Sequence, residues 1–182
     1  MYKLLILLIL FFCNSCAVSL LKKHKGIDPA FEPYISEIIE NSQGSLTRKS
    51  LENLTMGFEV MEDPEIGQCN KFTLEIGIAK TYWAGATEES RLSTVMHEIG
   101  HCILNKYHTD VKHEFWHDLP MDLGFIDTSG RLYDFCPASI MHPYDISWYC
   151  FVRHKKYYMD EFFGRANAQT YQATPWRLDG GL

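Results

Sequence analysis

Two histidines and a glutamate lie close together near the middle of the 182-residue chain, in the sequence HEIGH at residues 97–101. Histidines four residues apart on a helix project from one face, so the imidazoles of His97 and His101 can reach the same ion. A zinc ion binds neutral imidazole well and prefers four ligands in a tetrahedron. In this arrangement Glu98 does not bind the metal but takes a proton from the metal-bound water, which then attacks a polarised carbonyl. The spacing therefore predicts a hydrolytic zinc site.

The residues around this motif have the pattern of an amphipathic helix. Thr87, followed by Glu88 and Glu89, predicts the N-terminal end of that helix, because acidic residues favour the first turn. A polar helix face that carries the motif by chance is the alternative reading, and the amphipathic pattern argues against it. The apolar residues recur at three- and four-residue spacing: Leu92, Val95, Met96, Ile99 and Ile103.

A further histidine, His108, follows His101 by seven residues. Here the chain resembles the metzincin metallopeptidases, whose longer motif is HExxHxxGxxH and whose glycine ends the helix so that the third histidine binds the same zinc. Leu104 and Tyr107 occupy the positions of that glycine and that histidine. One residue later, Asn105 and His108 keep the same offset, and Asn is the next best residue after Gly for a left-handed helix cap. The resemblance thus implies a longer helix, a turn at Asn105 and His108 as third ligand.

Other third ligands stay open at this point. One extra helical residue rotates the exit of the chain by about 100°, so the following loop must compensate. Asp110, His113 and His117 are the alternative ligands. His108 would then be a surface histidine that follows a helix.

The sequence SIMHP at residues 139–143 resembles the metzincin Met-turn, a tight turn whose methionine lies below the zinc-binding histidines. The resemblance assigns Met141 this structural role under the metal. Some family members carry a tyrosine near this position that can bind zinc. Tyr144 is one position later, so the resemblance implies for it only the role of a hydrogen-bond donor to the transition state. An ordinary core methionine before a proline turn is the alternative reading of Met141.

The resemblance implies an α+β, zincin-like fold: a small mixed sheet with an edge strand over the zinc-binding helix, a Met-turn and a C-terminal helix. The sequence patterns agree in order, with a helix from Asp28 to about Gly44, strands at residues 57–61 and 72–80, and a helix at residues 153–163. In metzincin-like folds the strand just before the active-site helix is an edge strand, so extended substrate would pair with strand 72–80. A half-buried strand with a structural role is the alternative.

Residues 1–15 have the pattern of a signal peptide, with a basic residue before a short apolar run. Cys16 follows a small residue at the end of this leader, which resembles a bacterial lipobox and favours a lipid-bearing N-terminus. A plain secreted protein and an uncleaved anchor within residues 4–21 are the other readings, and the lysines that follow argue against export. Residues 16–27 would form a tether, and residues 28–182 a single metallopeptidase catalytic domain.

The net charge of −6 is spread over the chain without a basic block, which argues against nucleic acid as a partner. The expected partner is a protein or peptide substrate, and contact with a membrane is expected only through an N-terminal lipid. The chain is therefore predicted to be an exported monomer. It would be a bacterial lipoprotein anchored in the periplasm or at the cell surface, or otherwise a secreted protein.

Four cysteines follow the leader, at positions 69, 102, 136 and 150. An even number in an oxidising compartment predicts two disulfides, and the sequence leaves three pairings open. A bridge between Cys102 and Cys136 would join the zinc motif to the Met-turn. Cys102 as a thiolate zinc ligand is disfavoured, because it points about 100° away from His101 around the helix.

The residues favour a zinc-dependent endopeptidase with Zn²⁺ as cofactor, and two other classes stay open. One is a gluzincin-type zinc hydrolase whose third ligand is acidic, for which Glu161 on the late helix is the candidate. The other is a non-catalytic surface lipoprotein that binds zinc. A structural zinc site is normally closed by four protein ligands, and Glu98 would have no purpose there.

Overall fold

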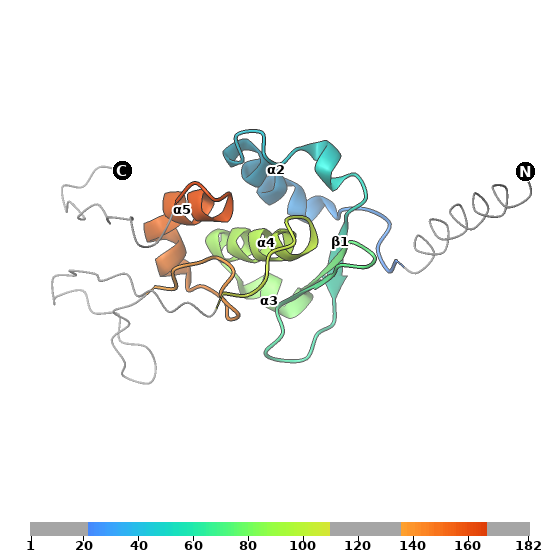
Figure 1. Ribbon diagram of the computed structural model, residues 1–182. Coiled ribbons are helices and arrows are strands. Elements are labelled where there is room, and N and C mark those ends of the chain that lie inside the picture. The colour runs from blue at the N-terminus through green and yellow to red at the C-terminus, as the bar shows by residue number, and fades with distance from the viewer. Residues whose placement is uncertain (1–21, 110–135, 167–182) are drawn as a thin grey trace, which may run out of the picture. The chain divides into compact units, whose positions relative to one another are not determined.

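The computed structural model describes residues 22–109 and 136–166 of the chain (Figure 1). The described residues form four α-helices and one three-stranded mixed sheet, which confirms the predicted α+β class. Several of the predictions concern other residues. The following lie outside the described residues: the signal peptide, Cys16, Asp110, His113 and His117.

The chain divides into two compact units. The first consists of residues 1–86 and 94–106, and the second of residues 87–93 and 107–182. The sheet belongs to the first unit, and the C-terminal helix belongs to the second.

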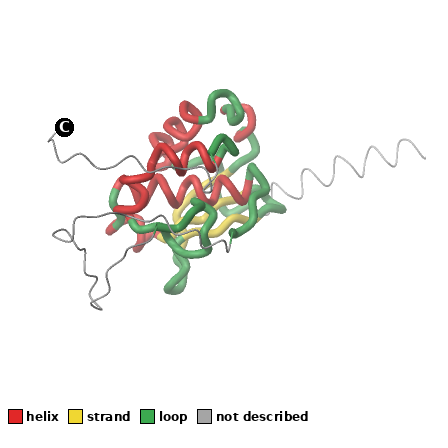
Figure 2. The backbone as a smooth tube through the Cα atoms, turned by 60° about the vertical axis from the view of Figure 1, so that its left-hand side comes forward, coloured by secondary structure: helices red, strands yellow, loops and turns green. Residues whose placement is uncertain are grey.

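The sheet of the first unit has the strand order β1-β3-β2, with its strands drawn in yellow in Figure 2. β1 (Thr55–Glu59) runs parallel to β3 (Glu75–Ala79), and β2 (Gly67–Asn70) runs antiparallel to β3. The predicted strands 57–61 and 72–80 correspond to β1 and β3, whose ends are shifted by a few residues.

The prediction that strand 72–80 lies at the edge of the sheet is wrong, because β3 pairs with a strand on each side. All five residues of β3 are buried, as expected of a central strand. Within the described residues, β2 is an edge strand instead. The sequence of β2, GQCN, is only four residues long and contains no large apolar residue, so its pattern is too weak to reveal a strand.

One face of the sheet carries the apolar core of the first unit. Met56 of β1 is paired with Ile76 of β3, and both side chains are fully buried. The ring of Phe31 lies 4.8 Å from the rings of Phe58 and Trp83, measured between centroids. Buried aliphatic and aromatic side chains therefore hold the sheet to its neighbouring helices.

The first helical segment starts where the sequence predicts. The Asp28 carboxylate accepts a hydrogen bond of 2.9 Å from the Ala30 amide, which caps a 3-10 turn at Pro29–Phe31. α2 (Glu32–Asn41) continues from this turn and ends before Gly44, whose φ of +89° suits glycine. The apolar face of this helical segment is buried at four positions: Phe31, Tyr34, Ile35 and Ile38.

α3 (Lys80–Gly85) and α4 (Glu88–Cys102) follow β3 along the chain. Thr87 caps α4 as predicted, because its hydroxyl oxygen accepts a hydrogen bond of 3.2 Å from the Ser90 amide. The apolar stripe expected around the histidine motif is buried at four positions: Leu92, Val95, Met96 and Ile99.

The second unit contains α5 (Trp148–Phe162), which begins five residues before the predicted start of the C-terminal helix at residue 153. The Ser147 hydroxyl caps α5 by accepting a hydrogen bond of 3.3 Å from the Cys150 amide. The backbone leaves helical geometry at His154, close to the predicted start. The apolar face of α5 is buried at four large residues: Phe151, Tyr157, Tyr158 and Phe162.

Two disulfides join Cys69 to Cys102 in the first unit and Cys136 to Cys150 in the second. The predicted number of disulfides is confirmed, and a Cys102–Cys136 bridge is not formed. Such bonds are compatible with an extracellular protein. In the part of the chain that the structure describes, each helix is too short or too polar to cross a bilayer.

Residues 22–27, which we predicted as part of a tether, contact the sheet. The Lys23 ammonium lies 2.8 Å from the Glu59 carboxylate. The His24 amide donates a hydrogen bond of 2.8 Å to the carboxylate of Glu75. Two ionic or polar contacts therefore hold this segment against β1 and β3.

Candidate metal centre

α4 ends in a widened turn before the loop that leads to His108. The amides of Ile103 and Leu104 both donate to the carbonyl oxygen of Ile99, at 2.9 and 3.3 Å, so the second bond spans five residues instead of four. Asn105 then adopts a φ of +52°, the left-handed conformation predicted for it. The wider turn accommodates the extra residue, and the prediction of a turn at Asn105 is confirmed.

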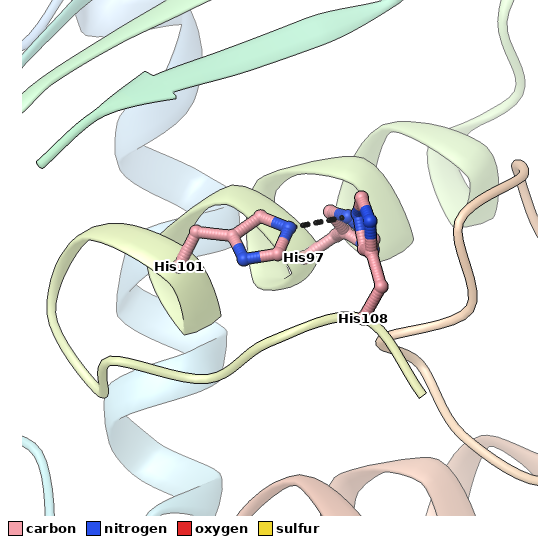
Figure 3. Close-up of side chains that lie close together, drawn as sticks. All are labelled: His97, His101 and His108. Atoms are coloured by element: carbon pink, nitrogen blue, oxygen red, sulfur yellow. Dashed lines mark hydrogen bonds between the residues drawn. The ribbon is translucent and has the colours of Figure 1, made fainter. Parts of the chain in front are cut away.

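Three histidine side chains converge beside this turn (Figure 3). His97 and His101 project from α4, and His108 projects toward them from the following loop. One ligand nitrogen of each ring lies within 4.8 Å of the others. The Nε2 atoms of His97 and His101 are 2.9 Å apart. The group can therefore hold a metal ion, and imidazole nitrogens are ligands that suit zinc and other transition metals.

The ring of His101 is oriented by the backbone that follows it. Its Nδ1 atom lies 2.9 Å from the carbonyl oxygen of Lys106. A carbonyl oxygen only accepts hydrogen bonds, so Nδ1 carries the proton and Nε2 keeps its lone pair. That lone pair points toward His97, on the side where an ion would bind. This is the second contact that metal-binding histidines usually make.

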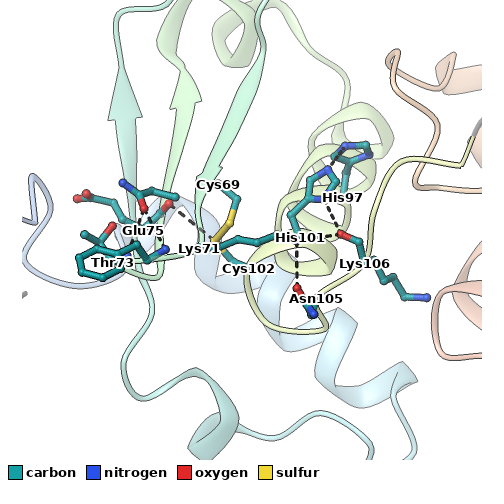
Figure 4. Close-up of a disulfide and its surroundings, with 11 residues drawn as sticks. Cys69, Lys71, Thr73, Glu75, His97, His101, Cys102, Asn105 and Lys106 are labelled. Carbon is teal, nitrogen blue, oxygen red and sulfur yellow. Dashed lines mark hydrogen bonds between the residues drawn. A yellow bond between two sulfur atoms is a disulfide. The ribbon is translucent and has the colours of Figure 1, made fainter.

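Lys71 supports the same carbonyl from the turn after β2 (Figure 4). Its ammonium donates a hydrogen bond of 3.1 Å to the side-chain oxygen of Asn105 and one of 3.4 Å to the carbonyl oxygen of Lys106. The carbonyl that orients His101 is thus held by a positive charge as well. Sequence reasoning missed Lys71, because nothing in the local pattern indicates its partners 34 and 35 residues away.

Glu98 lies on α4 between the two helical histidines and is 5% exposed. Burial, and to a smaller extent the negative charge of Glu65, raises the pKa of the Glu98 carboxyl to about 8. Among the described residues, its Oε2 atom has no hydrogen-bond partner. Glu98 directly follows His97 in the sequence, and a carboxyl group of this kind can take up and release a proton near neutral pH.

The disulfide between Cys69 and Cys102 fixes the C-terminal end of α4 to β2 (Figure 4). Cys102 directly follows His101 in the sequence. Because its sulfur is bonded to Cys69, Cys102 is not a thiolate ligand for a metal at the histidine group. The sequence left the pairing of Cys69 open, since its partner lies 33 residues away.

The predicted Met-turn lies in the second unit and forms a turn at residues 139–142. The His142 amide donates to the carbonyl oxygen of Ser139 at 3.2 Å, and the Met141 amide donates to the Ser139 hydroxyl at 3.1 Å. Met141 is 1% exposed. This segment is therefore a tight turn with a buried methionine.

Glu161 of α5 holds this turn from the side. Its carboxylate accepts hydrogen bonds from the Ser139 hydroxyl at 2.9 Å and from the Ile140 amide at 3.4 Å. The alternative third ligand is thus engaged with the turn, and it does not belong to the histidine group in the described residues. Tyr144 follows the turn, is 76% exposed, and has its ring 5.7 Å from the ring of His142.

No protein-family model, curated protein or solved structure matches this chain.

Proposed function

We propose that the protein is a zinc-dependent endopeptidase that resembles the metzincins. His97, His101 and His108 would be the zinc ligands, and Glu98 would be the general base. The observation that carries this proposal is the convergence of three imidazoles, together with a buried carboxyl group on the residue that follows His97 in the sequence. Three protein ligands leave a coordination position open, which distinguishes a catalytic zinc site from a closed structural one.

A zinc ion held there would supply Lewis acidity, which lowers the pKa of water and polarises the carbonyl of a peptide bond. Glu98 accepts a proton from the attacking water as the new carbon–oxygen bond forms. It then gives a proton to the leaving amine as the carbon–nitrogen bond breaks, so the carboxylate is restored. The high proton affinity that burial gives Glu98 suits this exchange.

The segment SIMHP at residues 139–143 would be the Met-turn of this enzyme, with Met141 in a structural role. Tyr144 stays a predicted donor to the transition state, and its exposed ring leaves it accessible to substrate. The substrate would be a protein or peptide. Both disulfides support the proposal that the chain works outside the reducing cytosol.

The gluzincin alternative is less well supported, because the carboxylate of Glu161 is bonded to Ser139 and Ile140. A protein that only binds zinc would not need a buried carboxyl group next to the ligands. Burying a carboxyl group without a hydrogen bond costs free energy. The presence of Glu98 at a buried position therefore supports a role for it in catalysis.

Glu98→Gln tests the proposal directly. Glutamine keeps the shape of the side chain but cannot accept the proton, so the variant should bind one zinc ion per chain and lose peptide hydrolysis by more than about 100-fold. Elemental analysis gives the zinc content, and a mixture of unstructured peptides serves as the substrate. Unchanged hydrolysis in Glu98→Gln would contradict the mechanism, and a parent without zinc would contradict the metal site. The matched control is Glu89→Gln, which changes an acidic residue in the first turn of the same helix.

A further inference from the structure

β2 meets the C-terminal half of α4 at alternate residues. Gly67 lies against Glu98, and Cys69 is bonded to Cys102. Lys71, just after β2, reaches Asn105 just after the helix. Alternate strand residues face one side, and helix residues four apart share a face. Two strand residues advance about 6.6 Å and four helical residues about 6 Å, so the two elements stay in register.

The contact between Gly67 and Glu98 leaves no room for a side chain on the strand. A Cβ atom on Gly67 would lie 2.7 Å from Oε1 of Glu98 and 3.1 Å from both Cδ and Cγ. Separations below 3.0 Å essentially do not occur for real Cβ atoms. Any residue other than glycine would therefore displace the Glu98 carboxyl group or the strand.

The backbone does not explain why glycine stands at this position. Gly67 is a strand residue, and its φ lies outside the left-handed region that favours glycine. Any residue could adopt this backbone. What glycine contributes at this position is the missing side chain. Because Glu98 is almost fully buried, its carboxyl group cannot swing into solvent to make space.

We propose that Gly67 is a positioning residue for Glu98. The bare backbone of the strand fixes where the carboxyl group lies, and a side chain at position 67 would displace it from that place. The catalytic meaning of this contact rests on the proposed function, whereas the contact itself does not. Its test therefore needs one measurement that is independent of activity.

The first measurement is a double-mutant cycle in urea denaturation, with the full chain and intact disulfides. Gly67→Ala should lower the denaturation midpoint of the parent, because the methyl group collides with the carboxyl group. In a Glu98→Ala background the same substitution should leave the midpoint unchanged, since the colliding atoms are gone. An equal loss in both backgrounds, or failure to fold in both, would overturn the proposal.

Gly77→Ala is the matched control in the same sheet. A Cβ on Gly77 would lie 2.7 Å from Oε1 of Glu59, a carboxylate outside the histidine group. Gly77→Ala should lower the denaturation midpoint of the parent. Glu59→Ala should remove this loss, and Glu98→Ala should not. Gly85→Ala, which would meet no atom within 4 Å, should leave the midpoint near that of the parent.

The second measurement is peptide hydrolysis. A displacement of about 1 Å of a catalytic group can cost about 100-fold in rate. Gly67→Ala should therefore lower kcat by about that factor while KM and zinc content stay at the parent values, and Gly85→Ala should keep the parent kcat. A parent kcat in Gly67→Ala would overturn the positioning role. If the parent hydrolyses no peptide, the proposed function fails, and the stability cycle still decides whether Gly67 places Glu98.

Discussion

The amide of Thr109 donates a hydrogen bond of 3.0 Å to the carbonyl oxygen of Met141. Thr109 is the residue that directly follows His108, so the turn at residues 139–142 holds the chain next to the proposed third ligand. The residue just before this turn is bonded to α5, because the Tyr157 hydroxyl donates to the Ala138 carbonyl at 2.5 Å. The place of His108 therefore depends on contacts that are distant in the sequence.

Glu161→Ala should destabilise the protein without removing the metal. The substitution leaves the Ser139 hydroxyl and the Ile140 amide without their acceptor, which costs about 1–3 kcal/mol when such groups are buried. Thermal unfolding gives the loss of stability, and elemental analysis gives the zinc content. Loss of zinc with an unchanged melting temperature would instead identify Glu161 as a ligand, as in the gluzincin alternative. The melting temperature of Glu161→Gln, which keeps one acceptor oxygen, should lie between those of the parent and of Glu161→Ala.

His108→Ala should weaken zinc binding sharply, because two imidazoles remain where three converge. Competition with a coloured chelator measures the dissociation constants of parent and variant. His142→Ala is the control, since His142 lies in the same unit but does not belong to the histidine group in the described residues. Equal zinc affinity in the parent and in His108→Ala would move the third ligand to another residue.

The sequence predicted the local parts of the site better than its long-range parts. The start of α4 at Thr87 and the turn at Asn105 depend on neighbouring residues, and both are confirmed. The choice of His108 followed from a three-residue offset and fits the observed group of imidazoles.

The parts that the sequence did not predict depend on tertiary pairing. β2 is four residues long and contains no large apolar residue, so its place beside β3 follows from the fold as a whole. The alternation of residues 72–80 predicts a strand, and the resemblance to metzincin-like folds places that strand at the edge of the sheet. The resemblance is wrong on this point, because β3 pairs with a strand on each side. The roles of Gly67 and Lys71 follow from this pairing and could not be seen without it.

Cys16→Ala tests the predicted lipid anchor. If Cys16 becomes the lipid-bearing N-terminus after export, its removal should release the protein from membranes into the soluble fraction. Fractionation of cells that express the full chain measures the distribution. The Cys13→Ala variant, three residues earlier, should still fractionate with membranes. A Cys16→Ala protein that stays with membranes would favour the uncleaved anchor.

The contacts of Asp160 with basic side chains predict that the stability of the protein depends on pH in the acid range. Hydrogen bonds from Lys156 and Arg165 lower the pKa of its carboxyl below the ordinary 3.8. The folded state therefore binds fewer protons than the unfolded state near that pH, and the stabilisation is present above 3.8 and lost as pH falls through the folded pKa. Asp160→Asn should lower stability at pH 7, by about 1 kcal/mol or less because the pair is partly exposed, and make no difference well below pH 3.8. A loss that persists at the lowest pH would show that packing, and not charge, is responsible.

Lys71 should affect the metal site although it touches no proposed ligand. Its ammonium holds the Lys106 carbonyl, and that carbonyl orients the His101 ring. Substitutions of groups that contact metal ligands typically cost about 10–100-fold in metal affinity. Lys71→Met acts one step further away, so zinc should bind about 10-fold more weakly, while Lys71→Arg keeps a positive donor and should restore most of the affinity. Equal affinity in the parent, Lys71→Met and Lys71→Arg would show that the backbone alone fixes the carbonyl.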